Sequence, residues 1–331
     1  MKAVVATRVG GPEVLEIRDL PEPQPGPGQV SIEVAYAGLN FADVMGRRGD
    51  LGPQADPFVP GMEIAGHIAA VGDDVGELQA GQAVCAFTDI GGYAEVAVAQ
   101  AALTFAVDDD SPDGLLRAAC TPTIGITAWS LLRHAGRLAV GETLLVHAAA
   151  GGLGTLVAQF ARHLRAGTII GTVGSAAKAD YAHDFGYDDV LLREDFASRL
   201  AAMSDRPGLD LVLDSVGGPT REQSLRLLAP YGRLVACGNA TQSKDFLAGA
   251  GKLMGLNASV VGYSVGALAA SAPHLVREAG LEALDLLDRG IARIDITEII
   301  ELDDIRSTHR RMEAGQTLGK LAIRLAGPSR P

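Results

Sequence analysis

Short apolar segments alternate with segments of helical character from Gly141 to Val265, and no other feature constrains the fold as strongly. Six of the apolar segments have the length and β-branched content of strands. They are ETLLVHA (142–148), GTIIGTV (167–173), DDVLL (188–192), LDLVLDSV (209–216), RLVACGN (233–239) and NASVVGYSV (257–265). Strands joined by helices pair in parallel, because each helix carries the chain back across the sheet. The alternation predicts an α/β fold with a doubly wound parallel sheet.

The chain up to about Pro122 has a different pattern, rich in glycine, proline and short Val, Ile and Ala runs. Segments such as VSIEVAYAG (30–38) and EIAGHIAAVG (63–72) are typical of a mostly antiparallel β domain. ITEIIELDDI (296–305) and GKLAIRL (319–325) look extended and would return the chain to it. A length of 331 residues suits two domains. We expect a β domain of residues 1–122 and 266–331, interrupted by an α/β domain of residues 123–265.

One helix boundary has a local signal. Thr220 and Gln223 have the spacing of a capping box, and Gly232 follows at the distance of a C-terminal cap. The pattern predicts a helix that opens at Thr220 and closes before Gly232.

Composition excludes several classes of protein. The net charge is −12 and no basic run is present, so nucleic acid is not expected as a partner. The N-terminus lacks the pattern of a signal peptide, and no apolar run has the length of a membrane span. The three cysteines are far apart in sequence, which argues against a disulfide framework. We expect a cytoplasmic protein without a membrane partner.

The segment AAGGLG (149–154) lies where the first predicted strand ends and a helix begins. Gly151 and Gly152 would let the backbone approach a pyrophosphate, with Leu153 and Gly154 opening the helix whose N–H groups face the phosphates. Ala149 replaces the first glycine of the GxGxxG pattern, so the pattern alone is weak and its context carries the inference. The alternative is a tight turn that binds nothing.

The second predicted strand ends without the acidic residue that commonly holds the ribose of NAD. It ends instead at Gly174 and Ser175, and Lys178 follows. Arg193 comes from the end of the neighbouring strand. The two cations suit a 2′-phosphate, although each alone could be a solvated surface charge. The sequence favours NADPH as the cofactor.

Several segments resemble the zinc-independent quinone oxidoreductases, the ζ-crystallin-like branch of the medium-chain dehydrogenase/reductase superfamily. They are AYAGLNFADV (35–44), GMEIAG (61–66), GGYAEVAV (91–98), HAAAGGLG (147–154), GTVGSAAKADYAHDFG (171–186) and DSVGG (214–218). The resemblance spans nearly the whole chain and implies a GroES-like β domain holding a Rossmann domain. It also implies that Thr127, Gly238 and Asn239 bind the cofactor, and that Asn40 lies at the nicotinamide and at the reacting carbonyl.

The resemblance also bears on metal. Zinc alcohol dehydrogenases of the superfamily have Cys where this chain has Asn40 and His where it has Met62, and an amide and a thioether cannot replace those ligands of catalytic zinc. We therefore expect no metal. Asn40 could instead donate a hydrogen bond to the developing oxyanion; a turn-forming role is the alternative. Asp43 and Glu63 are interpreted as structural.

Without a metal, the hydride acceptor must already be electrophilic. The leading hypothesis is an NADPH-dependent quinone oxidoreductase. The alternative is an NADPH-dependent enoyl reductase acting on α,β-unsaturated ketones or thioesters, and a third is a cofactor-binding protein without turnover. Some relatives have a tyrosine where this chain has Met45, so no proton donor is assigned. Tyr36, Tyr93 and Tyr263 remain possible donors, although tyrosines in β-rich segments are more commonly packing residues, and water is the alternative source of the proton. We interpret His67 and His147 as structural and Cys237 as inert.

The resemblance further implies a homodimer formed through the last strand of the sheet, near Ser259 to Tyr263. The small-molecule substrate, a quinone or an enone, would meet loops that include Asp50 to Phe58.

Overall fold

The computed structural model describes residues 1–52, 56–202, 208–243 and 248–325, so part of the predicted substrate loop at residues 50–58 lies outside the described residues. The chain divides into two compact units. Unit 1 comprises residues 1–126, 266–284 and 294–331, and unit 2 comprises residues 127–265 and 285–293. The sequence places these boundaries at residues 122/123 and 265/266.

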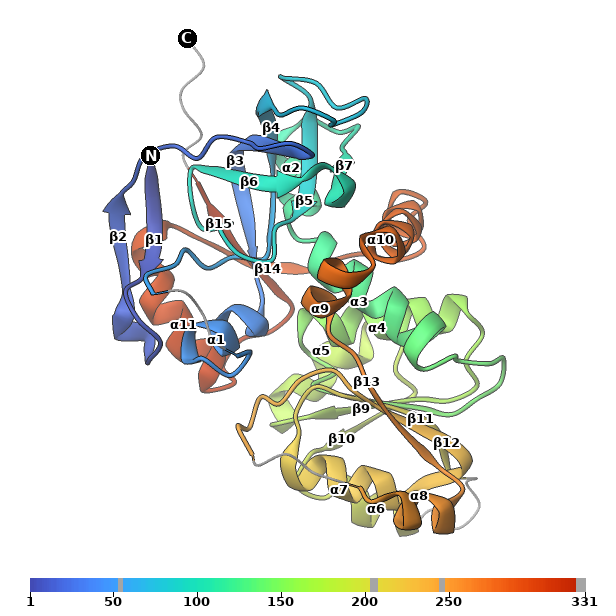
Figure 1. Ribbon diagram of the computed structural model, residues 1–331. Coiled ribbons are helices and arrows are strands. Elements are labelled where there is room, and N and C mark those ends of the chain that lie inside the picture. Colours follow the sequence, from blue (N-terminus) through green and yellow to red (C-terminus); the bar gives the residue numbers. More distant parts are fainter. Residues whose placement is uncertain (53–55, 203–207, 244–247, 326–331) are drawn as a thin grey trace. The chain divides into compact units, whose positions relative to one another are not determined.

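Unit 2 contains a six-stranded sheet with the order β10-β9-β8-β11-β12-β13, in which every neighbouring pair is parallel (Figure 1). The strands are β8 (Leu144–His147), β9 (Ile169–Val173), β10 (Asp189–Leu192), β11 (Leu209–Asp214), β12 (Leu228–Ala236) and β13 (Ser259–Gly262). All six strands predicted from the alternation are present. The order reverses at β8, so β8 and β11 are central, and their carboxyl ends form the edge where a nucleotide binds in such sheets. The predicted fold class is confirmed.

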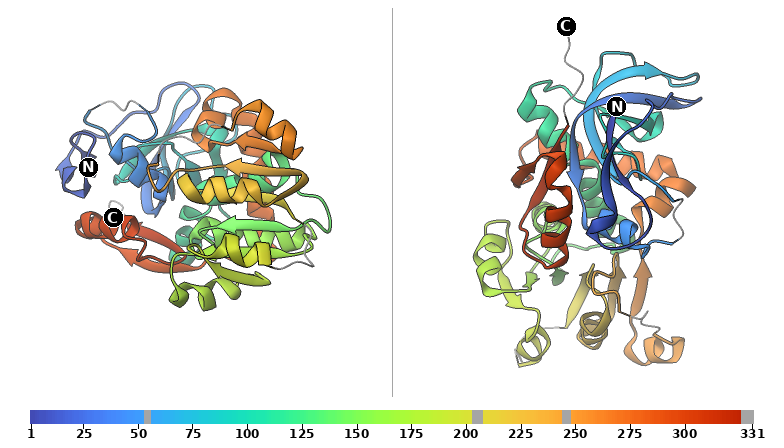
Figure 2. Two further views of the ribbon diagram at one scale, coloured as in Figure 1. Left: turned by 90° about the horizontal axis from the view of Figure 1, so that it is seen from below. Right: turned by 90° about the vertical axis from the view of Figure 1, so that its left-hand side faces the viewer.

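Helices cover both faces of this sheet (Figures 1 and 2). They are α4 (Gly152–His163), α5 (Ala179–His183), α6 (Phe196–Ala202), α7 (Gly218–Arg226) and α8 (Ala250–Leu256). In Figure 1, α4 and α5 lie above the sheet and α6, α7 and α8 below it. Buried apolar side chains such as Phe196 of α6 and Leu225 of α7 pack on Leu145 and Val212 of the central strands. This packing holds the strand ends, and the loops that follow them, in place.

The predicted capping box at Thr220 is wrong. Helix α7 begins two residues earlier, at Gly218, and its N-cap is Gly217 with φ +83°. Gly218 has φ +58°, so the two glycines make a turn that side chains rarely allow. Gly232 lies inside β12 rather than at a helix end. The glycine turn starts the helix earlier than the side-chain pattern of Thr220 and Gln223 suggested.

Unit 1 is built on a mostly antiparallel sheet with the order β14-β15-β3-β4-β5-β7, and β6 pairs with β3. Its strands are β3 (Gln29–Leu39), β4 (Glu63–Val71), β5 (Ala83–Phe87), β6 (Val96–Gln100), β7 (Thr104–Ala106), β14 (Ile296–Ile300) and β15 (Lys320–Arg324). A separate hairpin pairs β1 (Lys2–Ala6) with β2 (Leu15–Asp19). Side chains of β3 and β4 such as Ile32 and Ile64 form the buried core. This is the predicted β domain.

The helices of unit 1 lie outside this sheet. They are α1 (Phe41–Arg48), α2 (Pro112–Ala119) and α11 (Ile305–Glu313), with most of α9 (Val265–Ser271) and α10 (Pro273–Asp288). Helix α3 (Pro122–Ser130) begins in unit 1 and ends in unit 2, and the last turn of α10 also belongs to unit 2. The prediction that residues 296–305 are extended holds only as far as Ile300. Asp303 and Asp304 precede the N-terminus of α11, where carboxylates are favoured by the helix dipole.

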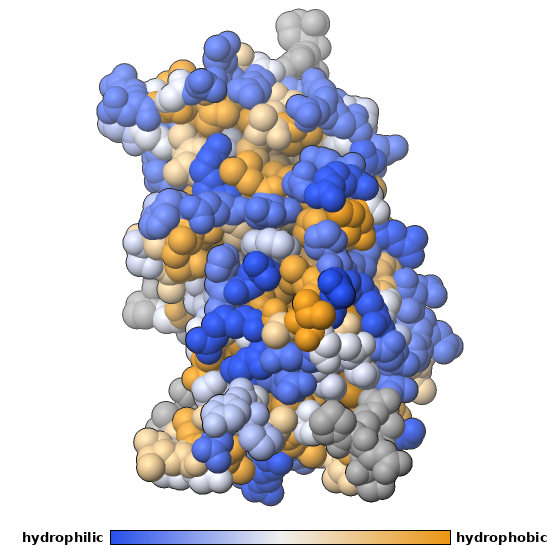
Figure 3. Space-filling view, turned by 90° about the vertical axis from the view of Figure 1, so that its right-hand side faces the viewer, coloured by the Kyte–Doolittle hydropathy of each residue, from blue (hydrophilic) through white to orange (hydrophobic). Residues whose placement is uncertain are grey.

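No single helix in the described part of the chain combines the length and apolar character needed to cross a bilayer. The bent pair Pro112–Ala119 and Pro122–Ala135 meets that test by length and composition only. On the face drawn in Figure 3, hydrophilic side chains are interspersed with apolar ones.

Candidate functional site

The predicted glycine turn lies between β8 and α4. Gly151 is the N-cap of α4, which begins at Gly152, and Ala148 has φ +58°. A Cβ on Gly154 would lie 2.6 Å from the carbonyl oxygen of Ala148, so the close packing of turn and helix requires this glycine. A Cβ on Gly151 would meet only that oxygen, at 3.4 Å. The chain's own packing therefore does not require Gly151, and the space beside it suits a pyrophosphate.

The alanine in place of the first glycine is accommodated by the neighbouring strand. A Cβ on Gly171 of β9 would lie 2.7 Å from the Cβ of Ala149. Tyr187 closes the same region, and its hydroxyl donates to the carbonyl oxygen of Gly154 at 2.7 Å. Gly171 thus leaves room for the methyl group of Ala149, and the incomplete GxGxxG pattern still forms the turn.

Two cations lie close together at the end of β9. The guanidinium of Arg193 lies over Gly174, where a Cβ would be 3.7 Å from Nη2. Burial lowers the pKa of Lys178, and the charge of Arg193 lowers that pKa further. The Nε of Arg193 is buried and has no hydrogen-bond partner among the described residues. Ser175 follows Gly174 in extended conformation. Two neighbouring cations with an unused donor suit a phosphate group.

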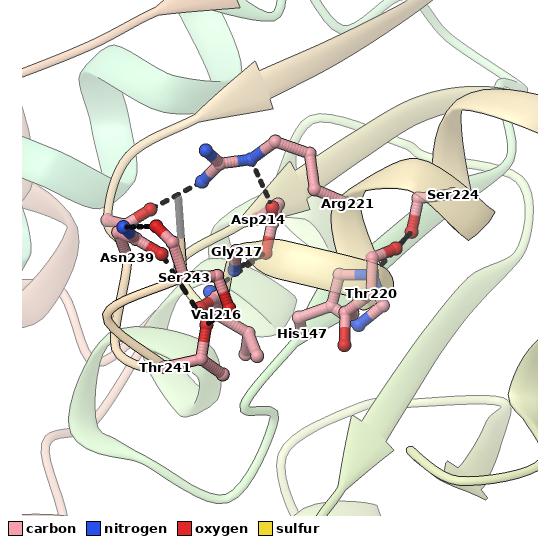
Figure 4. Close-up of polar contacts among 11 residues, drawn as sticks. His147, Asp214, Val216, Gly217, Thr220, Arg221, Ser224, Asn239, Thr241 and Ser243 are labelled. Carbon is pink, nitrogen blue, oxygen red and sulfur yellow. Dashed lines mark hydrogen bonds and ion pairs between the residues drawn. The ribbon is translucent and has the colours of Figure 1, made fainter. Parts of the chain in front are cut away.

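A buried ion pair fixes the two loops that follow β11 and β12 (Figure 4). Asp214, the last residue of β11, accepts hydrogen bonds from the backbone N–H groups of Val216 and Gly217 at 2.8 and 3.0 Å. Its other oxygen accepts from Nε of Arg221 at 2.6 Å. Arg221 also donates to the carbonyl oxygen of Gly238. Asp214 and Arg221 therefore position the Gly238 loop, and neither residue was predicted from the sequence to belong to the site.

Asn239 lies on this loop and points toward the turn of Gly217 (Figure 4). Its Nδ2 donates to the carbonyl oxygen of Ser243 at 2.8 Å. A Cβ on Gly217 would lie 2.2 Å from Oδ1 of Asn239, and one on Gly238 would lie 2.8 Å from the carbonyl oxygen of Ser215. The structure thus brings Gly238 and Asn239 to the same sheet edge as the glycine turn, while Thr127 lies buried on α3.

His147, at the end of β8, has two partners. Its Nε2 lies 2.8 Å from Oγ of Ser224, which itself donates to the carbonyl oxygen of Thr220. Because Ser224 uses its proton there, it accepts from Nε2–H, and Nδ1 accepts from the Thr172 hydroxyl at 2.7 Å. Burial lowers the pKa of His147 to about 4. The residue is neutral near pH 7 and fully hydrogen-bonded, as a structural residue would be.

In unit 1, Asn40 lies in a buried polar cluster. Its Nδ2 donates to Oε1 of Glu63 at 2.9 Å, and its Oδ1 accepts from Nζ of Lys320 at 2.6 Å. Lys320 also forms an ion pair with Glu63. A lysine can only donate and a carboxylate can only accept, so these partners set the orientation of the amide. One N–H of the Asn40 amide is left for another acceptor.

The second carboxylate oxygen of Glu63 binds a backbone N–H group. Its Oε2 accepts from the N–H of Thr123 at 2.7 Å. A Cβ on Gly38 would lie 2.3 Å from Oε1, so the glycine of AGLN leaves room for the carboxylate. Glu63 and Lys320 are both almost fully buried. Lys320 was not singled out in the sequence, because it lies 280 positions after Asn40 and only the antiparallel pairing of β15 with β3 brings them together.

Asp43 anchors the turn at Asn40. Its Oδ2 accepts from the N–H of Asn40 at 2.7 Å and from the hydroxyl of Tyr93 at 2.9 Å. These contacts start α1, and Gly49 with φ +83° ends it. Burial raises the pKa of Asp43 to about 7, against the opposing effect of the two hydrogen bonds. Asn40 thus opens a helix rather than only a turn.

The structure also places His67 and Cys237. His67 contacts the carboxylate of Asp110 at 2.5 Å. Burial raises the pKa of Cys237 to about 12, which keeps it a thiol. No group of three or more His, Cys, Asp or Glu side chains in the described ranges is arranged to hold a metal ion.

Two family models match the chain. Residues 26–109 match the alcohol dehydrogenase GroES-like domain, and residues 152–282 match the family described as zinc-binding dehydrogenase. A quinone oxidoreductase of Pseudomonas aeruginosa is 34% identical over 97% of this chain and 99% of its own length. The chain belongs to the quinone oxidoreductase family of the medium-chain dehydrogenases. The predicted family is confirmed.

Two further proteins are similar to this chain over nearly its whole length. The structure of Escherichia coli quinone oxidoreductase complexed with NADPH has a TM-score of 0.90 and 28% identity, covering 98% of this chain and all of that one. The rat synaptic vesicle membrane protein VAT-1 homolog is 30% identical over 100% of this chain and 85% of its own length.

Proposed function

We propose that the protein is an NADPH-dependent quinone oxidoreductase, the activity named for its relatives. The observation that carries the proposal is the pair Lys178 and Arg193 beside Gly174, at a strand end that has no acidic residue. Such a site attracts a 2′-phosphate and offers nothing to a ribose diol. The glycine turn supplies the second half of the site, because the space at Gly151 and the N-terminal N–H groups of α4 suit the pyrophosphate.

The nicotinamide of bound NADPH supplies a hydride. The chain's residues orient and bind: Thr127, Gly151, Gly152, Leu153, Gly154, Gly174, Ser175, Lys178, Arg193, Gly238 and Asn239 hold the dinucleotide, and Asn40 faces its nicotinamide end. Asn40 donates its remaining amide N–H to the substrate oxygen as negative charge develops there. Lys320 strengthens this donor by drawing charge toward Oδ1. A single donor of this type contributes roughly 2 to 4 kcal/mol to the lowering of the barrier.

Titration with dinucleotides tests the cofactor assignment. We expect Lys178→Ala and Arg193→Ala each to raise the Kd for NADPH about 10- to 100-fold, since each removes a charge-assisted hydrogen bond worth roughly 1.5 to 3 kcal/mol. The Kd for NADH should hardly change. Arg199→Ala, an exposed arginine of α6, is the matched control. Equal loss of NADH and NADPH binding would contradict a 2′-phosphate site.

Stopped-flow oxidation of NADPH by a panel of quinones and enones tests the reaction. Rapid turnover of quinones is expected. Turnover of enones alone would move the assignment to an enoyl reductase, and tight NADPH binding without any acceptor would indicate a cofactor-binding role.

Two further features complete the proposal. The chain forms a homodimer through β13, an edge strand in which Val260 is 37% exposed, because an open strand edge favours pairing. Light scattering should give twice the mass of the chain. The protein works in the cytoplasm, where its three free cysteines stay reduced.

A further inference from the structure

A row of charged and polar side chains, all but one of them buried, lies between α1 and α11, which are side by side in Figure 1. We call it the α1–α11 seam, formed by Asp43 and Arg47 of α1 and by His309 and Glu313 of α11. In each helix the two residues are four positions apart and therefore share one face. Arg47 and Glu313 form an ion pair. Tyr93 joins the seam, with its ring edge-to-face against His309 at 6.2 Å between centroids.

Several buried polar atoms of the seam have no hydrogen-bond partner in the protein. Oδ1 of Asp43, Nε and Nη1 of Arg47 and both ring nitrogens of His309 lack a hydrogen-bond partner among the described residues. Buried polar atoms in native proteins are nearly always hydrogen-bonded, and water serves where protein groups do not. Arg47 supplies donors, and neutral His309 supplies one donor and one acceptor. This set satisfies the two to four hydrogen bonds that an internal water makes.

The two ends of the seam lie in different surroundings. At the outer end, the side chain of Glu313 is 25% exposed, whereas that of Arg47 is fully buried. At the inner end, Asp43 accepts from the backbone of Asn40, beside the ion pair of Glu63 and Lys320. Water in the seam would therefore connect the turn at Asn40 with solvent.

The groups around Asp43 are either neutral or paired with an opposite charge. Lys320 of β15 and Glu63 of β4 balance each other, and Tyr93 is neutral because burial raises its pKa further above 10. Arg47 and Glu313 also balance, and His309 is neutral because burial lowers its pKa to about 3. The carboxyl group of Asp43 is then the titrating charge next to Asn40. Its pKa of about 7 leaves the proton on or off within the physiological range.

We propose that water in the α1–α11 seam exchanges the proton of Asp43 with solvent, and that Asp43 is a positioning residue that must be neutral for the substrate to gain charge at Asn40. This step rests on the proposed quinone reduction. A quinone that accepts a hydride gains two electrons and one hydrogen and becomes the hydroquinone monoanion, while NADPH becomes NADP⁺. An ionised Asp43 would repel that anion. An ionised Asp43 therefore takes up one proton from bulk water through the seam before the hydride is transferred, and can return it to solvent by the same path after the monoanion has left. The released monoanion takes its own proton from solvent.

Infrared titration of the protein without substrate tests the seam directly. The stretching band of a protonated carboxyl should disappear as the pH rises through about 7 and be missing from Asp43→Asn. Should that variant fail to fold, Tyr93→Phe identifies the band, because loss of the Tyr93 hydrogen bond removes stabilisation of the carboxylate and moves the titration to higher pH. A carboxyl that is ionised throughout the range above pH 5 would overturn the proposal.

A pH-jump experiment tests the path. His309→Phe keeps the aromatic contact with Tyr93 and removes both ring nitrogens. The relaxation of the Asp43 band should therefore become slower, by a factor of up to about 10. Met312→Leu changes an apolar side chain of the same helix and is the control. Equal relaxation in wild type and His309→Phe would show that protons reach Asp43 by another way.

Single-turnover reduction of a quinone tests the consequence. The rate in wild type should fall about 10-fold between pH 6 and pH 8, because the neutral fraction of a group with this pKa falls by that factor. The rate of Asp43→Asn should not change between the two pH values, and Tyr93→Phe should move the fall to higher pH. A pH-independent wild-type rate would overturn the role of Asp43. A protein that reduces no quinone would refute the proposed function, with the infrared results still deciding whether the seam exchanges protons.

Discussion

The two units build their parts of the candidate site in opposite ways. In unit 2, the turn at residues 149–154 is contiguous in sequence and leaves side chains out, so that space remains beside the start of α4. In unit 1, the cluster around Asn40 works by burying polar and charged side chains from four segments of the chain. The first arrangement depends on local backbone geometry, and the second depends on every partner being present. Substitutions should therefore have different effects in the two units.

The largest effect is expected in the cluster. Lys320→Met leaves Glu63 buried without its counter-charge, and removal of one partner of a buried pair costs about 3 to 5 kcal/mol. Urea unfolding would measure the loss. Arg324→Met, in the same strand, breaks an exposed pair with Glu301 and should cost less than about 1 kcal/mol. Similar values for the two variants would refute the view that the cluster depends on paired burial.

A second prediction compares the buried histidines, one in each unit. Burial lowers the pKa of His147 to about 4 and that of His309 to about 3, so both stabilise the fold above their unfolded pKa near 6.5 and lose this contribution as the pH falls. Between pH 7 and pH 4, the free energy of unfolding of His309→Phe should therefore fall by roughly 3 kcal/mol less than that of wild type. Asp43, whose pKa is raised, acts in the opposite direction, so the difference between variants is the quantity to measure.

The two histidines also differ in hydrogen bonding, because His147 has partners for both ring nitrogens and His309 has none among the described residues. His147→Phe removes the hydrogen bonds of the ring with the hydroxyls of Thr172 and Ser224 and should destabilise the protein at pH 7 by roughly 1 to 3 kcal/mol. A stability profile of His147→Phe equal to that of His309→Phe at every pH would show that these hydrogen bonds contribute nothing.

A third prediction separates fold from ligand within the glycine turn. Gly154→Ala puts a methyl group against the Ala148 carbonyl and should cost roughly 1 to 3 kcal/mol of stability, as overpacking does. Gly151→Ala has room in the fold and should leave unfolding nearly unchanged while weakening NADPH binding at least about 10-fold, since its methyl group occupies ligand space. Denaturation and dinucleotide titration of both variants would show whether the two glycines differ in this way.

The smallest effect concerns the departure from the GxGxxG pattern. Ala149→Gly restores the pattern but removes a methyl group that packs on Gly171, so we expect a loss of roughly 0.5 to 1 kcal/mol and no gain in NADPH affinity. Tighter binding by this variant would mean that Ala149 limits the site, contrary to its packing.

The nucleotide-binding unit was the more predictable one. The periodicity of strands and helices depends on residues that are close in sequence. Six parallel strands and the helix at Gly152 could therefore be predicted from residues 142–265 alone. The glycine turn was equally visible because its residues are neighbours. The start of α7 was misplaced, because a backbone turn at Gly217 and Gly218 outweighed a side-chain capping pattern.

The sequence by itself determined the order of elements, the glycine turn, the missing acid at Gly174 and the family resemblance, since each depends on residues close together along the chain. Only the tertiary structure decided that Lys320 and Glu63 orient Asn40, that Arg221 holds Asp214 and Gly238, and that α1 and α11 enclose a polar seam. The reason is physical: a buried charge is stabilised by whichever opposite charge or dipole the fold brings within a few ångströms, and sequence separation does not limit that choice.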